Sequence, residues 1–151
     1  MQITPRKINT FMLFKLPLAY IGGVRVKKIS ETDCIVKIKH RWLNQNPFKS
    51  MFWAAQGMAA EMTTGVLVMK NIAASNRKVS MLVTNQKGTF TKKATGRIQF
   101  VCKDGNKVAD AIQRSIDTGE GQTITMLAEG INEEQISVSS FEFEWSLKVK
   151  E

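Results

Sequence analysis

The stretch MFWAAQGMAAEMTTGVLVM, residues 51–69, is apolar, small or uncharged at every position except one, Glu61. Its alanines, methionines and leucine favour helix, and the composition predicts a long helix over about residues 50–74, closed by Asn76 and Arg77. A helix that is apolar nearly all round is normally buried on all sides. We therefore expect this helix to lie at the centre of the domain.

Glu61 is the residue of this helix that can carry chemistry. A carboxylate among apolar side chains is costly to bury unless it is protonated, paired or open to a wet pocket. Desolvation raises the pKa of such a group, which suits a general base or a nucleophile near neutral pH. At helical spacing Glu61 shares a face with Met58, Met62 and Gly65. The alternative is structural: Glu61 lies on a solvent-facing strip of the helix, or bonds a neighbouring backbone group.

The chain before this helix predicts a short helix and a hairpin. Thr4-Pro5 is a helix start, a hydroxyl cap followed by proline at the first helical position, and Pro17 with the Gly22-Gly23 pair ends the element. Residues 24–41 then alternate between apolar and polar side chains on either side of a polar turn at residues 30–33. This is the pattern of two antiparallel strands.

The second half of the chain predicts mostly strands, with a short helix inserted at about residues 106–118. Apolar residues alternate in four further stretches, 79–91, 98–102, 123–128 and 136–149. In the last of these the alternation slips at Ser139-Ser140, which indicates a β-bulge. The element order predicts an α+β fold in which one antiparallel sheet wraps around the buried helix. We expect residues 1–151 to form a single domain.

The charge of the chain favours anionic partners. Lysine and arginine outnumber acidic residues by 22 to 13, and the net charge of +9 suits nucleic acid, membrane headgroups or a phosphorylated small molecule. The alternative is that the charge only keeps the protein soluble, because the basic residues are spread along the chain. The sequence has no nucleic-acid-binding signature and no uninterrupted apolar run long enough to span a bilayer. We therefore expect neither nucleic acid nor a membrane as partner.

Two cysteines, Cys34 and Cys102, lie within predicted strands and lack the spacing of a metal site. We expect them to be reduced core residues, with no bound metal. Reduced cysteines fit a cytoplasmic location.

The loop before the long helix, WLNQNPFKS at residues 42–50, offers a second ingredient of a site. A helix N-terminus presents free backbone N–H groups, which can hold a carbonyl oxygen as it becomes an oxyanion. Asn44, Asn46 and Ser50 lie just upstream of these groups. They also suit turn formation and capping, and Ser50 is predicted to cap the helix.

These residues resemble a pattern of hotdog-fold thioesterases of the phenylacetate-pathway type. The pattern is a loop N-x-x-G-T-x-H-G-G that leads into a central helix with an Asp or Glu and, four residues later, a Gly. Residues 46–54, NPFKSMFWA, lie over this loop, and Glu61 and Gly65 stand at the acidic and glycine positions. Residues 90–96, FTKKATG, look like the family's aromatic-x-x-P/K-A-x-x-G signature between two strands of the sheet. The chain looks closest to an uncharacterised branch, a domain of unknown function with a degenerate His-Gly-Gly.

The resemblance implies an acyl-CoA thioesterase whose sites form between two subunits, in a homodimer or a tetramer. Glu61 would be the general base or nucleophile. The backbone N–H of Ala54 would polarise the thioester carbonyl, and Asn46 would orient the carbonyl or the water. No cofactor is implied, since coenzyme A is part of the substrate. The residues expected to bind substrate are Ser50, Phe52, Trp53, Met58, Gly65, Phe90, Lys92, Lys93 and Arg97.

Three of these residues, Lys92, Lys93 and Arg97, are expected near the phosphates of coenzyme A, which suit a basic rim. The alternative is that they form a solvated strand edge.

The departures from the pattern motivate other functions. Phe52, Trp53 and Ala54 stand where the family has His-Gly-Gly, and a tryptophan could either block the approach of a substrate or line an acyl pocket. A non-catalytic hotdog protein that binds acyl-CoA or fatty acyl ligands is the alternative function. A nucleic-acid-binding module rests only on the net charge. A dehydratase would need a histidine near the helix, and the one histidine, His40, lies on the strand before the loop.

Overall fold

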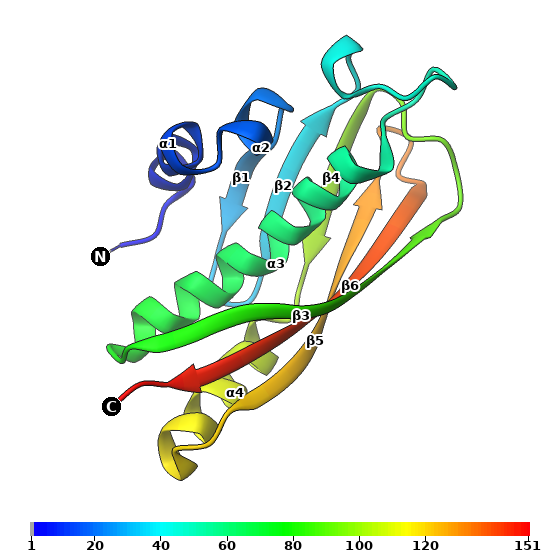
Figure 1. Cartoon of the computed structure of the whole chain (residues 1–151). Helices are drawn as coiled ribbons and strands as arrows, with labels where there is room; N and C mark the ends of the chain where they lie inside the picture. The colour runs from blue at the N-terminus through cyan, green and yellow to red at the C-terminus, as the bar shows by residue number, and fades with distance from the viewer. Residues whose placement is uncertain (1) are drawn as a thin grey trace.

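One antiparallel sheet of six strands wraps around a long central helix, α3 (Figure 1). The computed structural model describes residues 2–151. The strands lie in the order β1-β2-β4-β5-β6-β3. Their bounds are β1 Arg25–Ile29, β2 Cys34–Lys39, β3 Val79–Phe90, β4 Arg97–Cys102, β5 Gln122–Ile131 and β6 Ser137–Val149. The predicted α+β architecture, a sheet wrapped around a buried helix, is confirmed.

The central helix α3, Trp53–Ser75, is buried along most of its length. Within residues 55–68, Gly57, Met58 and Glu61 are the only residues that are partly exposed, and every other residue is buried. Such a helix has no charged face to turn toward water, so the sheet has to curve around it.

The loop that precedes α3 sets where the helix begins. The helix starts at Trp53, three residues later than the predicted start at about residue 50. The reason is that Phe52 has extended backbone angles and donates its N–H to the carbonyl of Asn44 at 2.7 Å. The helix ends at Asn76, whose left-handed conformation (φ 54°) is a common helix terminator, as predicted.

Two short helices precede the sheet, α1 at Pro5–Lys15 and α2 at Pro17–Ile21. Thr4 caps α1 by accepting the Lys7 N–H at 3.3 Å, as predicted. Pro17 was expected to end the helical element, and this is wrong in one respect, because Pro17 also begins α2. In the first turn of a helix the missing N–H of proline leaves no hydrogen bond unmade.

The two edges of the sheet differ. At the β1 edge, the side chain of Asn9 in α1 accepts the Val26 N–H at 2.8 Å and donates to the Val26 carbonyl at 3.0 Å, so α1 covers this edge. At the other edge, β3 pairs with β6, and the outer side of its 12 residues has no partner strand within residues 2–151. A long open edge strand is suited to pairing with another chain.

The inserted helix predicted at about 106–118 is α4, Gly105–Thr118, closed by Gly119 in the left-handed conformation. It packs against α3, β5 and β6 at the lower end of the molecule in Figure 1. The Gly105 N–H donates to the carbonyl of Thr32 at 3.0 Å, which ties the start of α4 to the turn between β1 and β2.

The last strand, β6, contains the predicted bulge. The bulge was expected at Ser139-Ser140 and lies one residue earlier. Opposite Gly130 and Ile131 of β5, β6 places the three residues 137–139, so Val138 is the additional residue. Ser139 has the same inward phase as Phe141 and Phe143, and the bulge places Val138 in the core beside it.

Further properties of the described chain bear on its chemistry. No helix within residues 2–151 is long and apolar enough to cross a membrane, and the same residues hold no cluster of three or more His, Cys, Asp or Glu side chains that could bind a metal ion.

Cys34 and Cys102 stand opposite each other on β2 and β4, both free and buried. Burial raises the pKa of both thiols to about 12, so they are inert core residues.

Replacement of Gly105 by alanine is expected to destabilise the fold. A Cβ there would overlap the carbonyl oxygen of Glu31 and lie 2.5 Å from the Cα of Thr32, and backbone atoms cannot move aside cheaply. We expect a loss of about 1–3 kcal/mol, measured as a lower midpoint of urea unfolding. Gly121→Ala is the control, because its Cβ would meet nothing closer than 3.8 Å. An equal midpoint for both variants would contradict the docking of α4 on the β1–β2 turn.

Candidate active site

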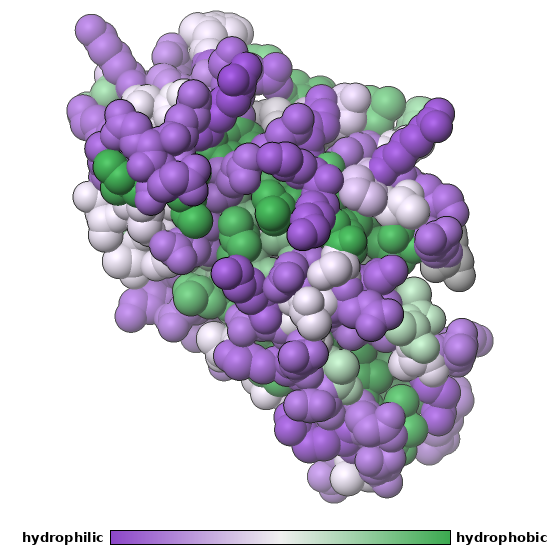
Figure 2. All heavy atoms as spheres, turned by 180° about the vertical axis from the view of Figure 1, so that it is seen from behind, coloured by the Kyte–Doolittle hydropathy of each residue, from purple (hydrophilic) through white to green (hydrophobic). Residues whose placement is uncertain are grey.

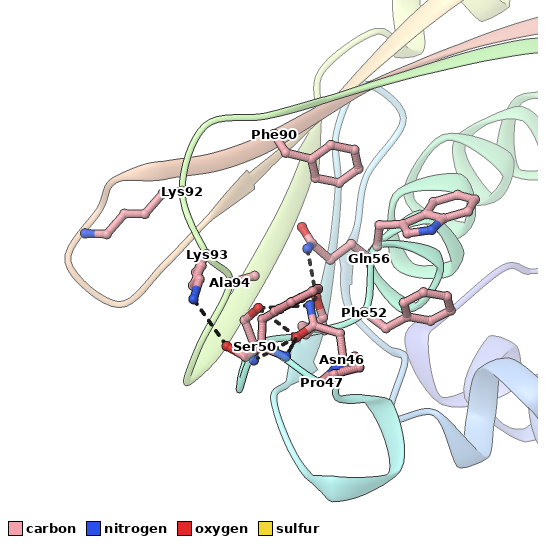
Figure 3. A pocket seen from close by; sticks show the side chains of 12 residues that line it. Asn46, Pro47, Ser50, Phe52, Gln56, Phe90, Lys92, Lys93 and Ala94 are labelled. Carbon is pink, nitrogen blue, oxygen red and sulfur yellow. Dashed lines mark hydrogen bonds between the residues drawn. The ribbon is translucent and has the colours of Figure 1, made fainter.

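A cavity of about 500 Å³ opens at the N-terminal end of α3. It lies between the loop at residues 45–52 and the segment at residues 90–94 that leaves β3 (Figure 3). Its walls are mostly apolar, and its size is that of an ordinary small-molecule site. The lining residues are Asn46, Pro47, Phe48, Ser50, Met51, Phe52, Trp53, Gln56, Phe90, Lys92, Lys93 and Ala94.

Most of the site residues predicted from the sequence meet at this cavity. Those that line it are Asn46, Ser50, Phe52, Trp53, Phe90, Lys92 and Lys93. The structure does not bring the others to its walls, and these are Ala54, Met58, Glu61, Gly65 and Arg97. Sequence reasoning missed Pro47, Phe48, Met51, Gln56 and Ala94. Two of these, Pro47 and Phe48, stand inside the loop that it had singled out.

The side chain of Asn46 shapes the loop before α3. Its oxygen accepts the N–H groups of Phe48 at 2.9 Å and Ser50 at 3.3 Å, and its amide donates to the Ser50 hydroxyl at 2.9 Å and the Met51 carbonyl at 3.3 Å. These bonds hold a turn in which Lys49 is left-handed (φ 59°), at the position where the resembling pattern has glycine. A role of Asn46 in orienting a substrate stays a prediction.

The predicted cap of α3, Ser50, is not the cap. Phe52 occupies that position, and no side chain of the described chain accepts a hydrogen bond from the first turn of the helix. The hydroxyl of Ser50 bonds the side chain of Asn46 instead, because the helix begins two residues too late for Ser50 to reach it. The prediction that Ser50 caps this helix is therefore wrong.

The first turn of α3 leaves two backbone donors free. The N–H groups of Ala55 and Gln56 both donate to the carbonyl of Phe52, at 3.0 and 3.2 Å. Within residues 2–151 no acceptor is found for the N–H groups of Trp53 and Ala54. The positive end of the helix dipole lies at the same place, so an oxygen atom that carries negative charge would be stabilised there.

Gln56 is a buried polar residue in the wall of the cavity (Figure 3). Its Oε1 accepts the Ser139 hydroxyl at 2.7 Å, and its Nε2 donates to the Met51 carbonyl at 3.4 Å. It therefore joins the loop, the start of α3 and the bulge of β6. The signal for it was present in the sequence, since a glutamine interrupts the small apolar residues one turn into the helix.

Glu61 lies two turns farther along α3, about 12 Å from Trp53 along the helix axis. It belongs to the partly exposed strip of the helix, together with Gly57 and Met58. A Cβ on Gly65 would lie 4.0 Å from Oε1 of Glu61 and 3.3 Å from the ring of Trp145. Gly65 therefore gives room to the tryptophan ring beside the carboxylate.

The carboxylate of Glu61 has no partner that would offset its desolvation. In the described part of the chain no hydrogen bond or ion pair reaches it, and burial raises the pKa of Glu61 above its ordinary value of 4.5. Neither structural alternative predicted for Glu61 describes it fully. Its strip of the helix is only partly exposed, and its carboxylate bonds no backbone group of the described residues. A carboxylate of this kind is a stronger base than one in water.

Three of the predicted residues make other contacts. Met58 extends toward Gly22 at the end of α2, because a Cβ on that glycine would lie 3.1 Å from its terminal methyl group. The backbone N–H of Arg97 donates to Oε1 of Glu133 at 2.9 Å. At the rim of the cavity, Lys93 donates to the carbonyl of Phe48 at 3.3 Å.

A family model described as "Domain of unknown function (DUF4442)" matches residues 4–147, nearly the whole chain. The chain belongs to the DUF4442 family. No curated protein matches it.

Solved structures share the fold of this DUF4442 chain. A Pseudomonas aeruginosa protein of unknown function, described as a probable thioesterase, is similar with a TM-score of 0.84 at 15% identity over 99% of both chains. A Chlorobaculum tepidum protein of unknown function reaches 0.83 at 18% identity over 99% of both chains. A Haemophilus influenzae thioesterase reaches 0.74 at 9% identity, over 99% of this chain and 93% of its own. At such identities the similarity shows the fold, and the predicted hotdog fold is confirmed.

Replacement of Glu61 by glutamine is expected to stabilise this DUF4442 domain at neutral pH. Because burial raises the folded-state pKa of Glu61, the stability contributed by its neutral form is fully present below the ordinary pKa of 4.5 and is lost as the pH rises through the higher folded value. Glutamine does not ionise. The Tm of the variant should therefore match wild type below about pH 4 and exceed it toward pH 8.

The exposed Glu129 provides the control, and Glu129→Gln should leave the pH dependence of Tm unchanged. A Glu61→Gln variant less stable than wild type at pH 8 would contradict a desolvated carboxylate without a partner.

Proposed function

We propose that the protein is an acyl-CoA thioesterase in which Glu61 acts as general base or nucleophile. The observation that carries the proposal is the desolvated carboxylate of Glu61, which has no hydrogen-bond or ion-pair partner within residues 2–151. The Ala54 N–H, for which the same residues hold no acceptor, supplies a donor for a carbonyl oxygen. Two proteins with this fold are described as thioesterases, one of them as probable, and this supports the same class of reaction here. The closer relation to the phenylacetate-pathway branch is part of the proposal.

Each group of the site has a task in thioester hydrolysis. In the general-base route, Glu61 takes a proton from a water molecule while the water oxygen attacks the thioester carbonyl carbon. Negative charge then develops on the carbonyl oxygen, and the free N–H groups of Trp53 and Ala54 are donors suited to it. When the carbon–sulfur bond breaks, the leaving thiolate takes up the proton that Glu61 holds. The products are a carboxylic acid and a free thiol.

In the nucleophilic route the carboxylate of Glu61 itself attacks the thioester carbonyl carbon. The thiolate leaves and an acyl anhydride forms on Glu61, which water then hydrolyses to release the acid and restore the carboxylate. Desolvation makes the carboxylate of Glu61 a stronger base in the first route and a stronger nucleophile in the second.

The cavity fits the acyl part of such a substrate. Phe48, Phe52, Trp53 and Phe90 give it aromatic walls, which suit an apolar or aromatic acyl group. Lys92 and Lys93 lie at the outer side (Figure 3), where they can meet the phosphates of coenzyme A. Lys92 is also 3.7 Å from Glu134, in an exposed pair that a phosphate could replace.

A homodimer that shares its sites would explain why Glu61 is not in the wall of the cavity. The outer edge of β3 is open over 12 residues, and pairing with β3 of a second protomer would close it. We infer that each site combines the cavity of one protomer with Glu61 of its partner.

The alternative function is binding of acyl-CoA or a fatty acyl ligand without turnover. The observation that favours it is the aromatic pair at the start of α3, where the rings of Phe52 and Trp53 meet edge to face with centroids 5.9 Å apart. In the resembling pattern the same positions hold histidine and glycine, so a catalytic histidine is absent and a bulky ring stands at the cavity.

Glu61→Gln is expected to lower kcat/KM for acyl-CoA hydrolysis by about 10²–10⁴-fold, because the base or nucleophile is lost while the shape of the site is kept. The measurement is thiol release over a panel of aliphatic and aromatic acyl-CoAs. Glu129→Gln is the matched control and should retain wild-type activity. Undiminished hydrolysis by Glu61→Gln would eliminate the proposed mechanism. Tight ligand binding by wild type with no turnover across the panel would favour the binding function.

Mixed dimers test whether the site is shared. Trp53→Asp places a carboxylate in the apolar cavity and should abolish turnover, while an acidic residue in the first helical turn favours folding. In a dimer of Trp53→Asp with Glu61→Gln, a shared arrangement leaves one site with both groups intact. We expect co-expression of the two inactive variants to restore about half of the wild-type activity per mixed dimer. A mixed dimer as inactive as its parents would show that each site lies within one protomer.

A further inference from the structure

Large apolar side chains stand exposed at the end of the molecule that carries α1, α2 and the loop before α3. The five most exposed of them are Phe14 73%, Leu18 74%, Trp42 79%, Leu43 57% and Phe48 69%. We call these five residues the apolar end. Single exposed apolar residues are common, but a gathering of this size marks an interaction surface.

Hydrogen bonds hold α2 and the loop before α3 together. Arg41 donates to the carbonyl of Ile21, and the side chain of Asn44 donates to the carbonyl of Gly22 at 2.9 Å, so the short helix η1 at Trp42–Asn44 is fixed to the end of α2. The Asn44 carbonyl accepts the Phe52 N–H at the other end of the loop that holds Phe48. In Figure 1, α2, the turn after β2 and this loop lie together at the upper end.

The helix α1 turns apolar side chains both inward and outward. Ile8 and Met12 are buried at 3% and 0% exposure, whereas Phe11 and Phe14 are exposed at 43% and 73%. A helix that only covered a sheet edge would present polar residues to water. Its outer side therefore needs an apolar medium or partner.

The net positive charge lies in the same part of the sequence, because residues 1–60 hold few acidic residues. Residues 1–60 contain ten lysines and arginines and two acidic residues, Glu31 and Asp33, a net +8 out of the total of +9. The two acidic residues lie in the β1–β2 turn, where the Glu31 carbonyl accepts from Asn71 near the far end of α3. The segments that carry the apolar end contain no acidic residue, and their basic residues are Arg6, Lys7, Lys15, Arg41 and Lys49. The β5–β6 turn carries the acidic Glu133 and Glu134, and Glu134 pairs with Lys92 beside the cavity.

We propose that the apolar end docks on the surface of an anionic lipid bilayer. Aromatic and aliphatic side chains would enter the boundary between headgroups and acyl chains, while the surrounding lysines and arginines meet lipid phosphates. The predicted absence of a membrane partner rested on the lack of a spanning segment, and surface docking needs none. The proposal stands independently of the thioesterase function.

A second copy of the chain fits this surface less well. A two-fold interface places the same patch of both copies together, and here it would bring two clusters of basic residues face to face. An anionic bilayer instead neutralises the basic residues and accepts apolar side chains that come from three separate segments. Since the cavity shares Phe48 with the apolar end, docking would also place the mouth of the cavity near the lipid.

Cosedimentation of the whole chain with vesicles tests the proposal. The vesicles are phosphatidylcholine alone, or phosphatidylcholine with about one third phosphatidylserine. Wild type should bind the anionic vesicles and stay in solution with the neutral ones. The double variant Phe14→Ser/Leu18→Ser should bind at least about tenfold more weakly, and Lys7→Glu/Lys15→Glu should lose binding to a similar extent.

The controls change the same residue types on other surfaces, Leu127→Ser on β5 and Lys103→Glu after β4. They should bind like wild type. All altered side chains are exposed, so the variants are expected to keep the wild-type Tm, which is measured alongside. Equal binding of the double variants and the controls, or no binding of wild type to anionic vesicles, would overturn the proposal. So would sedimentation velocity in which Phe14→Ser/Leu18→Ser dissociates an oligomer, since the apolar end would then be a protein interface.

Discussion

The burial of α3 is the constraint on which the rest of the structure depends. A helix of 23 residues without a charged face cannot lie on the surface, so the sheet curves until strands, α4 and α2 cover it. The cover is incomplete along one narrow strip, and this strip holds Glu61. Solvation of the carboxylate is therefore limited by the same packing that stabilises the fold. Gly65 has no side chain, so the ring of Trp145 can lie close to the helix beside the carboxylate of Glu61.

The start of α3 follows from a competition for polar groups. A serine cap contributes about 1 kcal/mol to a helix, yet Ser50 and Asn46 bond each other in the loop. The residue left at the cap position is Phe52, which has no acceptor to offer. Because no side chain of the described residues caps α3, two N–H donors of its first turn stay free beside an apolar cavity. This is an arrangement that a bound oxygen atom would complete, and it supports a ligand site more strongly than the cavity does alone.

The elements of the fold could be predicted because their signals are local. Periodicity located the hairpin, the inserted helix and the strands, and the composition of residues 51–69 located the central helix. Positions that depend on distant contacts could not be predicted. The start of α3 is set by the bond from Phe52 to the Asn44 carbonyl, which lies eight residues upstream.

The candidate site could be predicted to the same extent, in its local segments and not in its distant contacts. The loop and the helix supplied most of the cavity residues, because they are contiguous in the sequence. The pairing of Gln56 with Ser139 joins residues 83 positions apart, next to a bulge whose place was missed by one residue, and no local pattern indicates it. That Glu61 lacks a partner among the described residues is likewise a property of the packed structure, since any of the 22 basic residues could have approached it.

The two contacts inferred for this protein, pairing of protomers along β3 and docking of the apolar end on a bilayer, use different parts of the fold. Pairing of protomers along β3 would take place at the edge opposite to β1 in the strand order, and α1 lies on β1. The backbone pairing itself would involve β3 and neither α1 nor α2, which carry Phe14 and Leu18. The open edge of β3 therefore does not by itself explain their exposure, which we ascribe to a second partner. The basic residues that surround them determine which chemistry this partner has.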